Sequence, residues 1–221
     1  MIDIYAYEHF SFDLWMTIIK SNPEFKPKRT ILFKEYFSID KSVEEIDKTI
    51  RYYDNLYNLI SEKTGNHIER EEIFLLILNV LGKNVELINS EDIDDFFIKS
   101  DLLFLENRPQ IIWKEISSIL EKITDLGKTA NILSNTAFIH GNSLREVLKS
   151  LNLEQYFTFM IFSDEVGVSK PNIKIFEYLY ENTQKIKQLE KSKIIHVGDN
   201  IKADYEGALK FGFDAKLVKF I

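Results

Sequence analysis

The segment HFSFDLWMT, residues 9–17, decides the fold class of this chain. Its apolar run ends at the carboxylate of Asp13, which is typical of a buried strand that leads into a loop. Similar polar junctions follow in ANILSNT (130–136), KPNIKIF (170–176) and IIHVGDNIKAD (194–204). The carboxyl ends of parallel strands meet at one edge of a sheet, where ligands bind. We therefore expect the polar residues of these four segments to share one pocket.

The pattern around these junctions alternates between strands and helices. The strand-like runs are 129–133, 159–162, 193–197 and 215–218, and the helical patterns are 112–123, 144–151, 173–180 and 203–210. Such alternation predicts parallel strand pairing with helices on both faces. The expected fold class is α/β, with a three-layer Rossmann-like parallel sheet as its core.

A helical segment interrupts this pattern between residues 30 and 100. Ser42 and Glu45 fit a capping box at a helix start, and Gly65-Asn66 is a natural helix stop. Further helices are predicted over residues 69–81 and from Ser90.

We predict that residues 21–99 form an all-helical cap domain inserted into a core made of residues 1–20 and 100–221. Because Pro23 and Pro27 lie close together, residues 18–29 are predicted to be a loop or flap.

Composition excludes several classes of protein. The chain has 221 residues and a net charge of -7, which argues against a general nucleic-acid binder. Cysteine is absent, no apolar run approaches the roughly 20 residues of a membrane span, and the N-terminus does not resemble a signal peptide. We expect a cytoplasmic protein, a monomer or weak homodimer, with neither a nucleic acid nor a membrane as its partner.

The predicted pocket would hold a carboxylate from Asp13, a hydroxyl from Ser134, an ammonium from Lys170, and the carboxylates of Asp199 and Asp204. These groups suit phosphoryl transfer assisted by a divalent cation. The alternative for each carboxylate and for Ser134 is a helix cap, which is a common structural role.

The four segments resemble the motifs of the haloacid dehalogenase superfamily of hydrolases, and this resemblance covers about residues 9–20 and 100–221. The resemblance implies that Asp13 is the nucleophile and forms an aspartyl-phosphate. It implies that Ser134 donates a hydrogen bond to a phosphoryl oxygen and that Lys170 offsets the negative charge. The expected substrate is a small phosphorylated metabolite.

The resemblance also implies a Mg²⁺ site, because Mg²⁺ prefers oxygen ligands. Its ligands would be the side chains of Asp13 and Asp199 and the backbone carbonyl of Trp15. Asp204 would orient those ligands. Thr17 and Asn135 are expected to be supporting contacts to the substrate.

Trp15 departs from the family pattern, because phosphatases of the family usually carry there an Asp that acts as general acid and base. An indole cannot transfer a proton in this way at neutral pH. Three readings remain open. The chain is a phosphatase whose acid comes from elsewhere, a metal-free hydrolase of the haloacid dehalogenase type, or a phosphate-ligand binding protein with little turnover.

Other polar residues have simpler expected roles. The four histidines do not show the spacing of metal ligands, and His196 is predicted to be a satisfied core residue. Lys26, Lys28 and Arg29 are expected to be a solvated basic cluster. The tyrosines of the helical segment, Tyr52, Tyr53 and Tyr57, are expected mainly in its core.

Overall fold

The structure is a computed structural model that describes residues 2–220. Its centre is a parallel sheet of five strands in the order β5-β4-β1-β6-β7. The strands are β1 (His9–Phe12), β4 (Thr129–Ser134), β5 (Phe159–Phe162), β6 (Ile194–Gly198) and β7 (Asp214–Leu217). All five lie within a few residues of their predicted positions, so the predicted parallel α/β core is confirmed.

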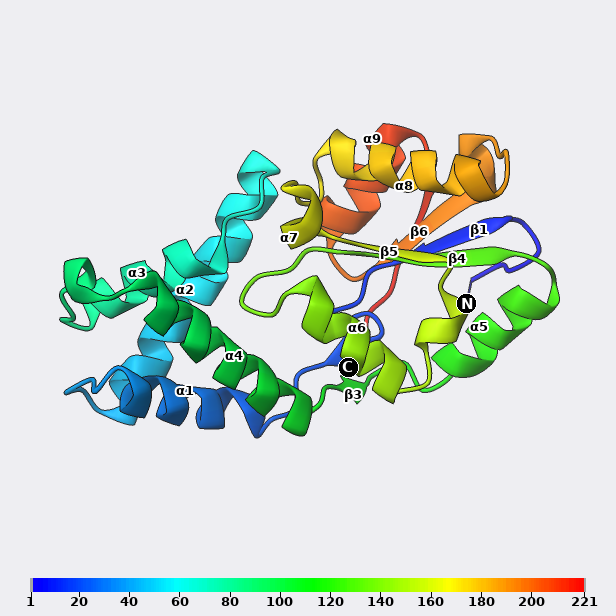
Figure 1. Cartoon of the computed structure of the whole chain (residues 1–221). Coiled ribbons are helices and arrows are strands. Elements are labelled where there is room, and N and C mark those ends of the chain that lie inside the picture. The colour runs from blue at the N-terminus through cyan, green and yellow to red at the C-terminus, as the bar shows by residue number, and fades with distance from the viewer. Residues whose placement is uncertain (1, 221) are drawn as a thin grey trace.

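Helices cover both faces of this sheet, which makes three layers (Figure 1). One face carries α5 (Ile116–Asp125) and α6 (Gly141–Ser150), and the other carries α8 (Ile173–Ile186) and α9 (Gly207–Phe211). Residues of each strand point alternately to the two faces. Phe10 and Phe12 of β1 therefore pack with α5 and α6, whereas Leu133 of β4 packs with α8 and α9.

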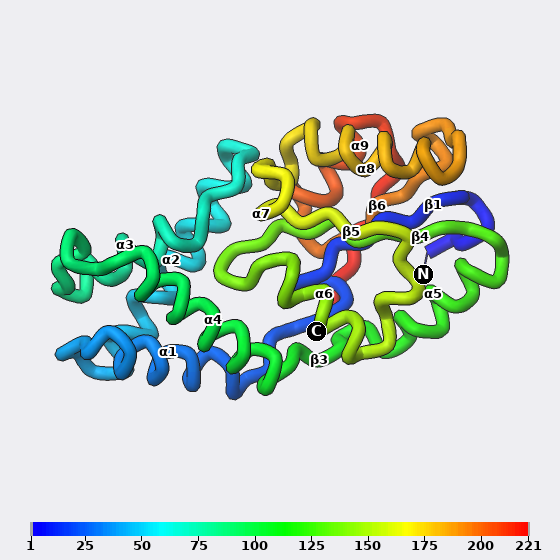
Figure 2. Tube along the Cα trace, viewed as in Figure 1, coloured from blue at the N-terminus to red at the C-terminus, as the bar shows by residue number. Residues whose placement is uncertain are grey.

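The helical segment lies beside the carboxyl edge of the sheet (Figure 2). It consists of α1 (Phe25–Tyr36), α2 (Val43–Thr64), α3 (Arg70–Val80), the short turn η1 (Val85–Leu87) and α4 (Ser90–Glu106). The predicted capping box at Ser42 is present. The segment has an aromatic-rich core of its own, which includes Phe33, Phe74 and Phe96. Tyr57 is buried in this core, whereas Tyr52 is exposed.

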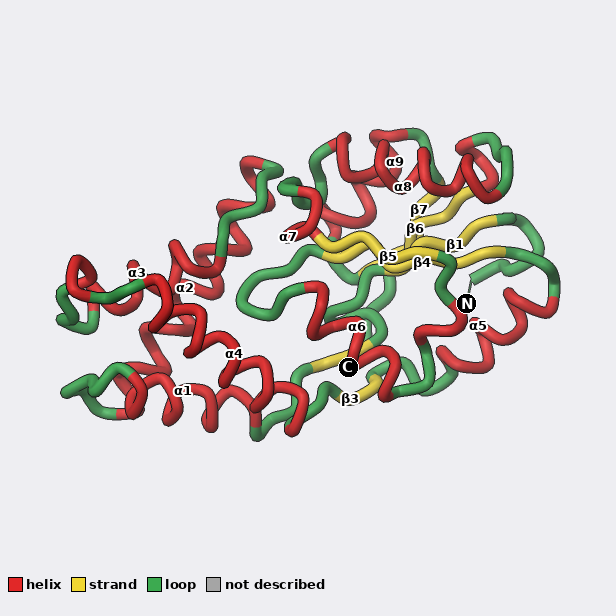
Figure 3. The backbone as a smooth tube through the Cα atoms, in the orientation of Figure 1, coloured by secondary structure: helices red, strands yellow, loops and turns green. Residues whose placement is uncertain are grey.

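A small antiparallel ribbon joins the two places where the chain leaves and re-enters the sheet core. It pairs β2 (Ile19–Lys20) with β3 (Gln110–Ile111) (Figure 3). The sequence did not indicate this ribbon, because each strand is only two residues long. The predicted helix over 112–123 consequently begins only at Ile116.

Two further predictions in this region need correction. Residues 18–29 are not all loop, because α1 begins at Phe25 and includes Pro27. A proline is tolerated there because the N–H groups of the first helical turn have no partner within the helix. The predicted boundary between residues 99 and 100 falls inside α4, which continues to Glu106.

Short elements complete the core. They are η2 (Glu154–Tyr156), α7 (Ser163–Val166), η3 (Lys191–Lys193) and a π-helical turn, η4 (Ile201–Glu206). Within residues 2–220, none of the helices combines the length and the apolar character needed to cross a lipid bilayer.

Gly65 joins the helical segment to the core. It ends α2 with a φ of 69°, and its carbonyl accepts hydrogen bonds from the backbone N–H of Ser169 (3.0 Å) and from Asn172 Nδ2 (3.0 Å). Next to it, Asn66 forms an antiparallel bridge with Val168. A Cβ at Gly65 would lie 2.8 Å from that of Asn172. Glycine is therefore needed here for its conformation and for the close approach.

We predict that Gly65→Ala destabilises the protein more than Gly82→Ala does. Both positions have positive φ, which a side chain opposes by about 1 kcal/mol or more. A Cβ at Gly82 would meet nothing within 4 Å, so that variant isolates the backbone contribution. Urea denaturation of both variants measures the difference, and equal losses would show that the contact with Asn172 does not constrain Gly65.

Candidate active site

The predicted polar residues lie at the carboxyl edge of three adjacent strands. Asp13 follows the central strand β1, Ser134 ends β4, and Asp199 follows β6. The N–H of Asp13 donates to the carbonyl of Val197 at 2.9 Å, which extends the β1–β6 ladder to Asp13. Asp13 and Asp199 border a cavity of about 560 Å³ between the sheet edge and helices α1 and α2, and Ser134 is not among the residues that line it.

Lys170 lies at the centre of this site. Its ammonium donates to Asp13 Oδ1 (2.8 Å), Asp204 Oδ1 (2.6 Å) and the carbonyl of Leu133 (2.7 Å). Only 1% of the residue is exposed. Asn135 holds its backbone from both sides, accepting from the Lys170 N–H at 2.7 Å and donating to its carbonyl at 2.9 Å. Asn135 thus positions Lys170 as well as lining the cavity.

Asp204 is held by the π-helical turn η4. Its Oδ2 accepts from the backbone N–H of Asn200 at 2.9 Å, and its Oδ1 lies 3.1 Å from His196 Nε2. The side chain passes so close to Gly198 that a Cβ there would lie 2.2 Å from it. This contact explains the glycine of the Gly198-Asp199 motif. His196 also bonds to Ser11 Oγ at 2.9 Å, so the predicted satisfied core histidine is confirmed.

The site contains more negative than positive charge. Burial raises the pKa of Asp13 to about 7, although the Lys170 ammonium acts to lower it. Burial and the charge of Asp204 likewise raise the pKa of Asp199. For Asp204 itself burial is outweighed by Lys170 and His196, which hold its pKa below the usual range. Burial opposes the charge on Lys170, but Asp13 and Asp204 together raise its pKa.

These residues fit a divalent cation. One carboxylate oxygen from each of Asp13, Asp199 and Asp204 lies within 4.8 Å of the others. Three carboxylates share a single ammonium, so a cation would neutralise the excess charge, and oxygen is the ligand atom that Mg²⁺ prefers. The expected role of the Trp15 carbonyl stays a prediction, although Trp15 does line the cavity.

The other predicted site residues occupy different depths. Ser134 Oγ donates to Asp13 Oδ1 at 3.3 Å and is fully buried. Thr17 is also fully buried and is not among the residues that line the cavity, so its expected contact with substrate stays a prediction. The indole of Trp15 packs against Phe104 of α4, with ring centroids 6.2 Å apart.

Arg29 is the residue whose importance the sequence interpretation missed. Lys28 is exposed as predicted, but Arg29 is only 4% exposed and lines the cavity. Its guanidinium packs over the rings of Phe25 and Phe138. No hydrogen bond or ion pair to it is found within residues 2–220, and its Nε is buried without a partner. The sequence did contain one indication that Arg29 is buried. Phe25, Arg29 and Phe33 are spaced four residues apart, so all three lie on one face of the helix.

Comparison with known proteins agrees with this geometry. A model of the family described as haloacid dehalogenase-like hydrolase matches residues 10–218. The pyrimidine 5'-nucleotidase YjjG of Escherichia coli (strain K12) is 36% identical over 72 residues, which are 32% of this chain and 31% of that protein. The (S)-2-haloacid dehalogenase 2 of Pseudomonas sp. (strain CBS-3) is 33% identical over 101 residues, which are 46% of this chain and 41% of the dehalogenase. Both matches thus span less than half of the relatives' own length.

The solved structures extend the agreement to the whole fold. One of them is the putative HAD-hydrolase YfnB from Bacillus subtilis, in an orthorhombic crystal form bound to magnesium. It superposes with a TM-score of 0.69 at 18% sequence identity, and the match covers 96% of this chain and 88% of the YfnB chain. Since the family model spans nearly all of the residues that build the sheet and its polar edge, this chain belongs to the haloacid dehalogenase-like hydrolases.

Proposed function

We propose that this hydrolase is a Mg²⁺-dependent phosphatase that acts on a small phosphorylated metabolite through an aspartyl-phosphate on Asp13. The observation that carries the proposal is the surplus of carboxylates around Lys170. A site for an uncharged or monoanionic substrate has no need of three carboxylates with only one counterion. A cation and a phosphoryl group together match this arrangement.

In this proposal Asp13 and Asp199 hold the cation, with the Trp15 carbonyl as a further ligand, and Asp204 keeps Lys170 in place. The cation, when bound, neutralises charge on the phosphoryl oxygens and favours the ionised form of Asp13. Lys170 and Ser134 bind the phosphoryl oxygens in the transition state, where negative charge is spread over them.

The chemistry then proceeds in two displacements. A carboxylate oxygen of Asp13 forms a bond to phosphorus, and the bond between phosphorus and the leaving oxygen breaks. Water hydrolyses the aspartyl-phosphate, which releases phosphate and restores the Asp13 carboxylate. The leaving alkoxide needs a proton in the first step, and the Trp15 side chain has none to give at neutral pH. The proposal therefore requires a good leaving group, an acid from the helical segment, or an acid carried by the substrate.

Arg29 indicates the substrate class. A buried guanidinium without an ion-pair partner is costly unless a ligand pairs with it. Asp54, which also lines the cavity, is already engaged with Lys26 at 3.6 Å. We propose that Arg29 binds a second anionic group of the substrate, a carboxylate or a second phosphate, at the end of the cavity formed by α1.

The second candidate function is a metal-free hydrolase of the haloacid dehalogenase type. Trp15 favours it, because displacement of a halide needs no proton. A haloacid dehalogenase among the relatives also supports this candidate. The third candidate, a phosphate-ligand binding protein with little turnover, rests on the same residue. The surplus of carboxylates favours the phosphatase and the binding protein over the dehalogenase, and measured turnover separates the first two.

We predict Mg²⁺-dependent phosphate release on a panel of phosphorylated metabolites and no chloride release from 2-haloacids. Asp13→Asn should reduce the phosphatase rate on the order of 10⁴-fold, as loss of a nucleophile does elsewhere. Asp125→Asn, which changes an exposed carboxylate at the end of α5, is the matched control. Metal-independent chloride release would replace the phosphatase by the dehalogenase, and tight phosphate-ester binding without turnover would favour the binding protein.

We predict that Trp15→Asp raises turnover on alkyl phosphates more than on aryl phosphates. A positioned acid matters most when the leaving oxygen is strongly basic, and the gain could reach about 10²-fold. Circular dichroism must first show an intact fold, because the change removes an apolar group packed on Phe104. Equal rate changes on the two substrate types would indicate that Trp15 serves to pack the substrate.

We predict that Arg29→Met raises KM by about 10- to 100-fold for substrates with a second anionic group, as expected from the loss of one charge-assisted contact. KM for p-nitrophenyl phosphate, which has no second anion, should change little. The protein should keep its stability, because the substitution removes a buried charge that has no partner. Lys28→Met on the exposed face of α1 is the control. An equal rise in KM for both kinds of substrate would contradict the assignment.

A further inference from the structure

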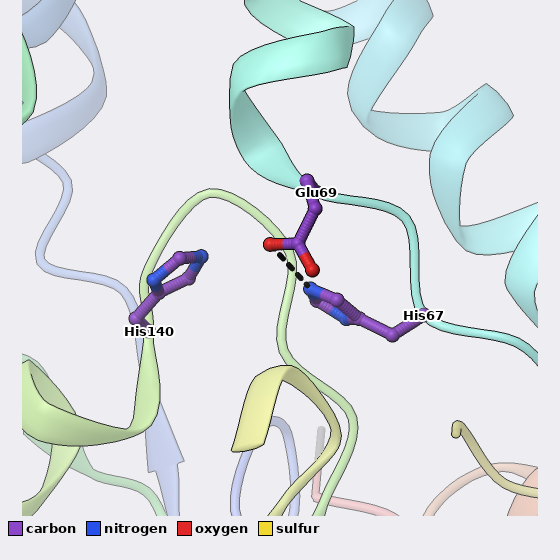
Figure 4. Close-up of side chains that lie close together, drawn as sticks. All are labelled: His67, Glu69 and His140. Carbon is purple, nitrogen blue, oxygen red and sulfur yellow. Dashed lines mark ion pairs between the residues drawn. The ribbon is translucent and has the colours of Figure 1, made fainter. Parts of the chain in front are cut away.

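A second group of metal-ligand side chains lies outside the carboxylate site, where the helical segment meets the core. His67 and Glu69 come from the link between α2 and α3, and His140 directly precedes α6. Figure 4 shows the three side chains turned toward a common point. One ligand atom from each lies within 4.8 Å of the others, and His67 Nε2 is 3.9 Å from Glu69 Oε2. The sequence spacing of the histidines gave no sign of this group, which only the tertiary structure brings together.

Both imidazoles have an unused nitrogen. In the described part of the chain, the Nε2 atoms of His67 and His140 are buried and have no hydrogen-bond partner. A buried polar atom without a partner costs about 1 to 3 kcal/mol. Two such atoms beside one carboxylate point to a ligand that binds nitrogen.

The hydrogen bonds around His67 leave the lone pair on Nε2. Tyr57 Oη lies 2.6 Å from the carbonyl oxygen of Thr136, which has no hydrogen, so the tyrosine must be the donor. His67 Nδ1 lies 2.9 Å from the same Oη and 3.2 Å from Ser163 Oγ. Since the Oη proton is used, the contact with Oη needs an N–H on Nδ1, and Ser163 Oγ, which also accepts from the Thr136 N–H, is a second acceptor for it. The neutral imidazole then carries its free lone pair on Nε2. Metal-binding histidines are typically oriented in this way, by a partner on the other ring nitrogen.

The surrounding charges favour a cation. The carboxylate of Asp164 lies 3.9 Å from His140 Nδ1, and Glu69 faces both rings. Arg70 is the positive group nearby, and it pairs with Glu71 and Asp101 and packs over Phe97. Carboxylates thus outnumber the guanidinium.

We propose that His67, Glu69 and His140 form a second metal site, which takes a transition-metal ion such as Zn²⁺. Two imidazoles and a carboxylate are a usual set of protein ligands for zinc, with a fourth position open to water. The set does not suit Mg²⁺, which prefers oxygen. The inference is independent of the proposed phosphatase activity, because none of the three residues lines the active-site cavity.

Binding would join the helical segment to the core, because His67 and Glu69 belong to the first and His140 to the second. Ligands of a tetrahedral zinc ion with bonds of about 2.0–2.1 Å lie about 3.3 Å apart. His67 Nε2 and Glu69 Oε2, now 3.9 Å apart, would therefore move closer. The exposed side chain of Glu69 can move freely. His67 is tied to the core by its N–H, which donates to the carbonyl of Gly167 at 3.2 Å, three residues before Lys170. The metal would therefore strengthen the contact between the helical segment and the loop that carries Lys170.

The test starts from the whole chain stripped of transition metals with a chelator, to which excess Mg²⁺ is added. This protein is then titrated with Co²⁺ and afterwards with Zn²⁺. Co²⁺ should give the visible absorption of a four-coordinate site at one equivalent, and Zn²⁺ should displace it. His67→Gln and His140→Gln should each weaken Zn²⁺ binding by at least about 100-fold, measured by competition with a chromophoric chelator. Tyr57→Phe should weaken it by about 10-fold or more, because it frees the His67 ring.

Glu69→Gln should also weaken Zn²⁺ binding, because it removes a ligand carboxylate. Glu71→Gln is its matched control and should leave binding unchanged, because Glu71 pairs with Arg70 and is not one of the three ligands. Asp199→Asn must leave the Co²⁺ spectrum unchanged, whether or not it affects phosphatase activity. The proposal is overturned if the wild-type chain shows no Co²⁺ absorption. It is equally overturned if Zn²⁺ binding survives in both histidine variants, or is lost in Asp199→Asn. Circular dichroism of each variant excludes loss of folding as the cause.

Discussion

The buried ammonium of Lys170 is the constraint on which the active site depends. It bridges Asp13 from β1 and Asp204 from η4 at 2.8 and 2.6 Å, and it also bonds to the end of β4. Two carboxylates this close and this deeply buried would repel one another without it. Removing one partner of such a buried group typically costs about 3 to 5 kcal/mol. The same ion pairs that organise the site therefore also connect the ends of neighbouring sheet elements.

The loop that carries Lys170 has two further supports, and each comes from a different part of the chain. Asn135, after β4, bonds to both backbone groups of Lys170. Gly65, at the end of α2, accepts hydrogen bonds from Ser169 and Asn172 on either side of it. The helical segment thus contacts the loop that carries Lys170 directly as well as bordering the cavity. A change in how this segment docks would move Lys170, which is a physical route from the proposed zinc site to the proposed magnesium site.

The two proposed metal sites differ in chemistry in a way that would separate their ions. The carboxylate site offers only oxygen ligands from the side chains identified there, together with strong negative charge. The site between the helical segment and the core offers two imidazole nitrogens that have no hydrogen-bond partner within residues 2–220. A hard cation prefers the first and a transition metal the second. The two groups also lie in different places. The carboxylates border the cavity, whereas the histidines lie where the helical segment meets the core.

The sequence alone determined the parallel core and the residues at its polar edge. The apolar run of each strand and the polar residue at its end are local properties, so Asp13, Ser134 and Asp199 could be placed at one edge of the sheet from the sequence. Ser42 and Gly65 likewise marked the ends of α2, because helix caps depend on a few adjacent residues.

Tertiary structure alone decided what the helical segment does. Whether Arg29 is solvated or buried depends on how α1 packs against Phe138, which lies far away in sequence. Whether His67 meets His140 depends on where the segment docks against the core. Docking joins residues that share no local pattern, and so no spacing in the sequence could reveal the group of His67, Glu69 and His140 or the guanidinium in the cavity.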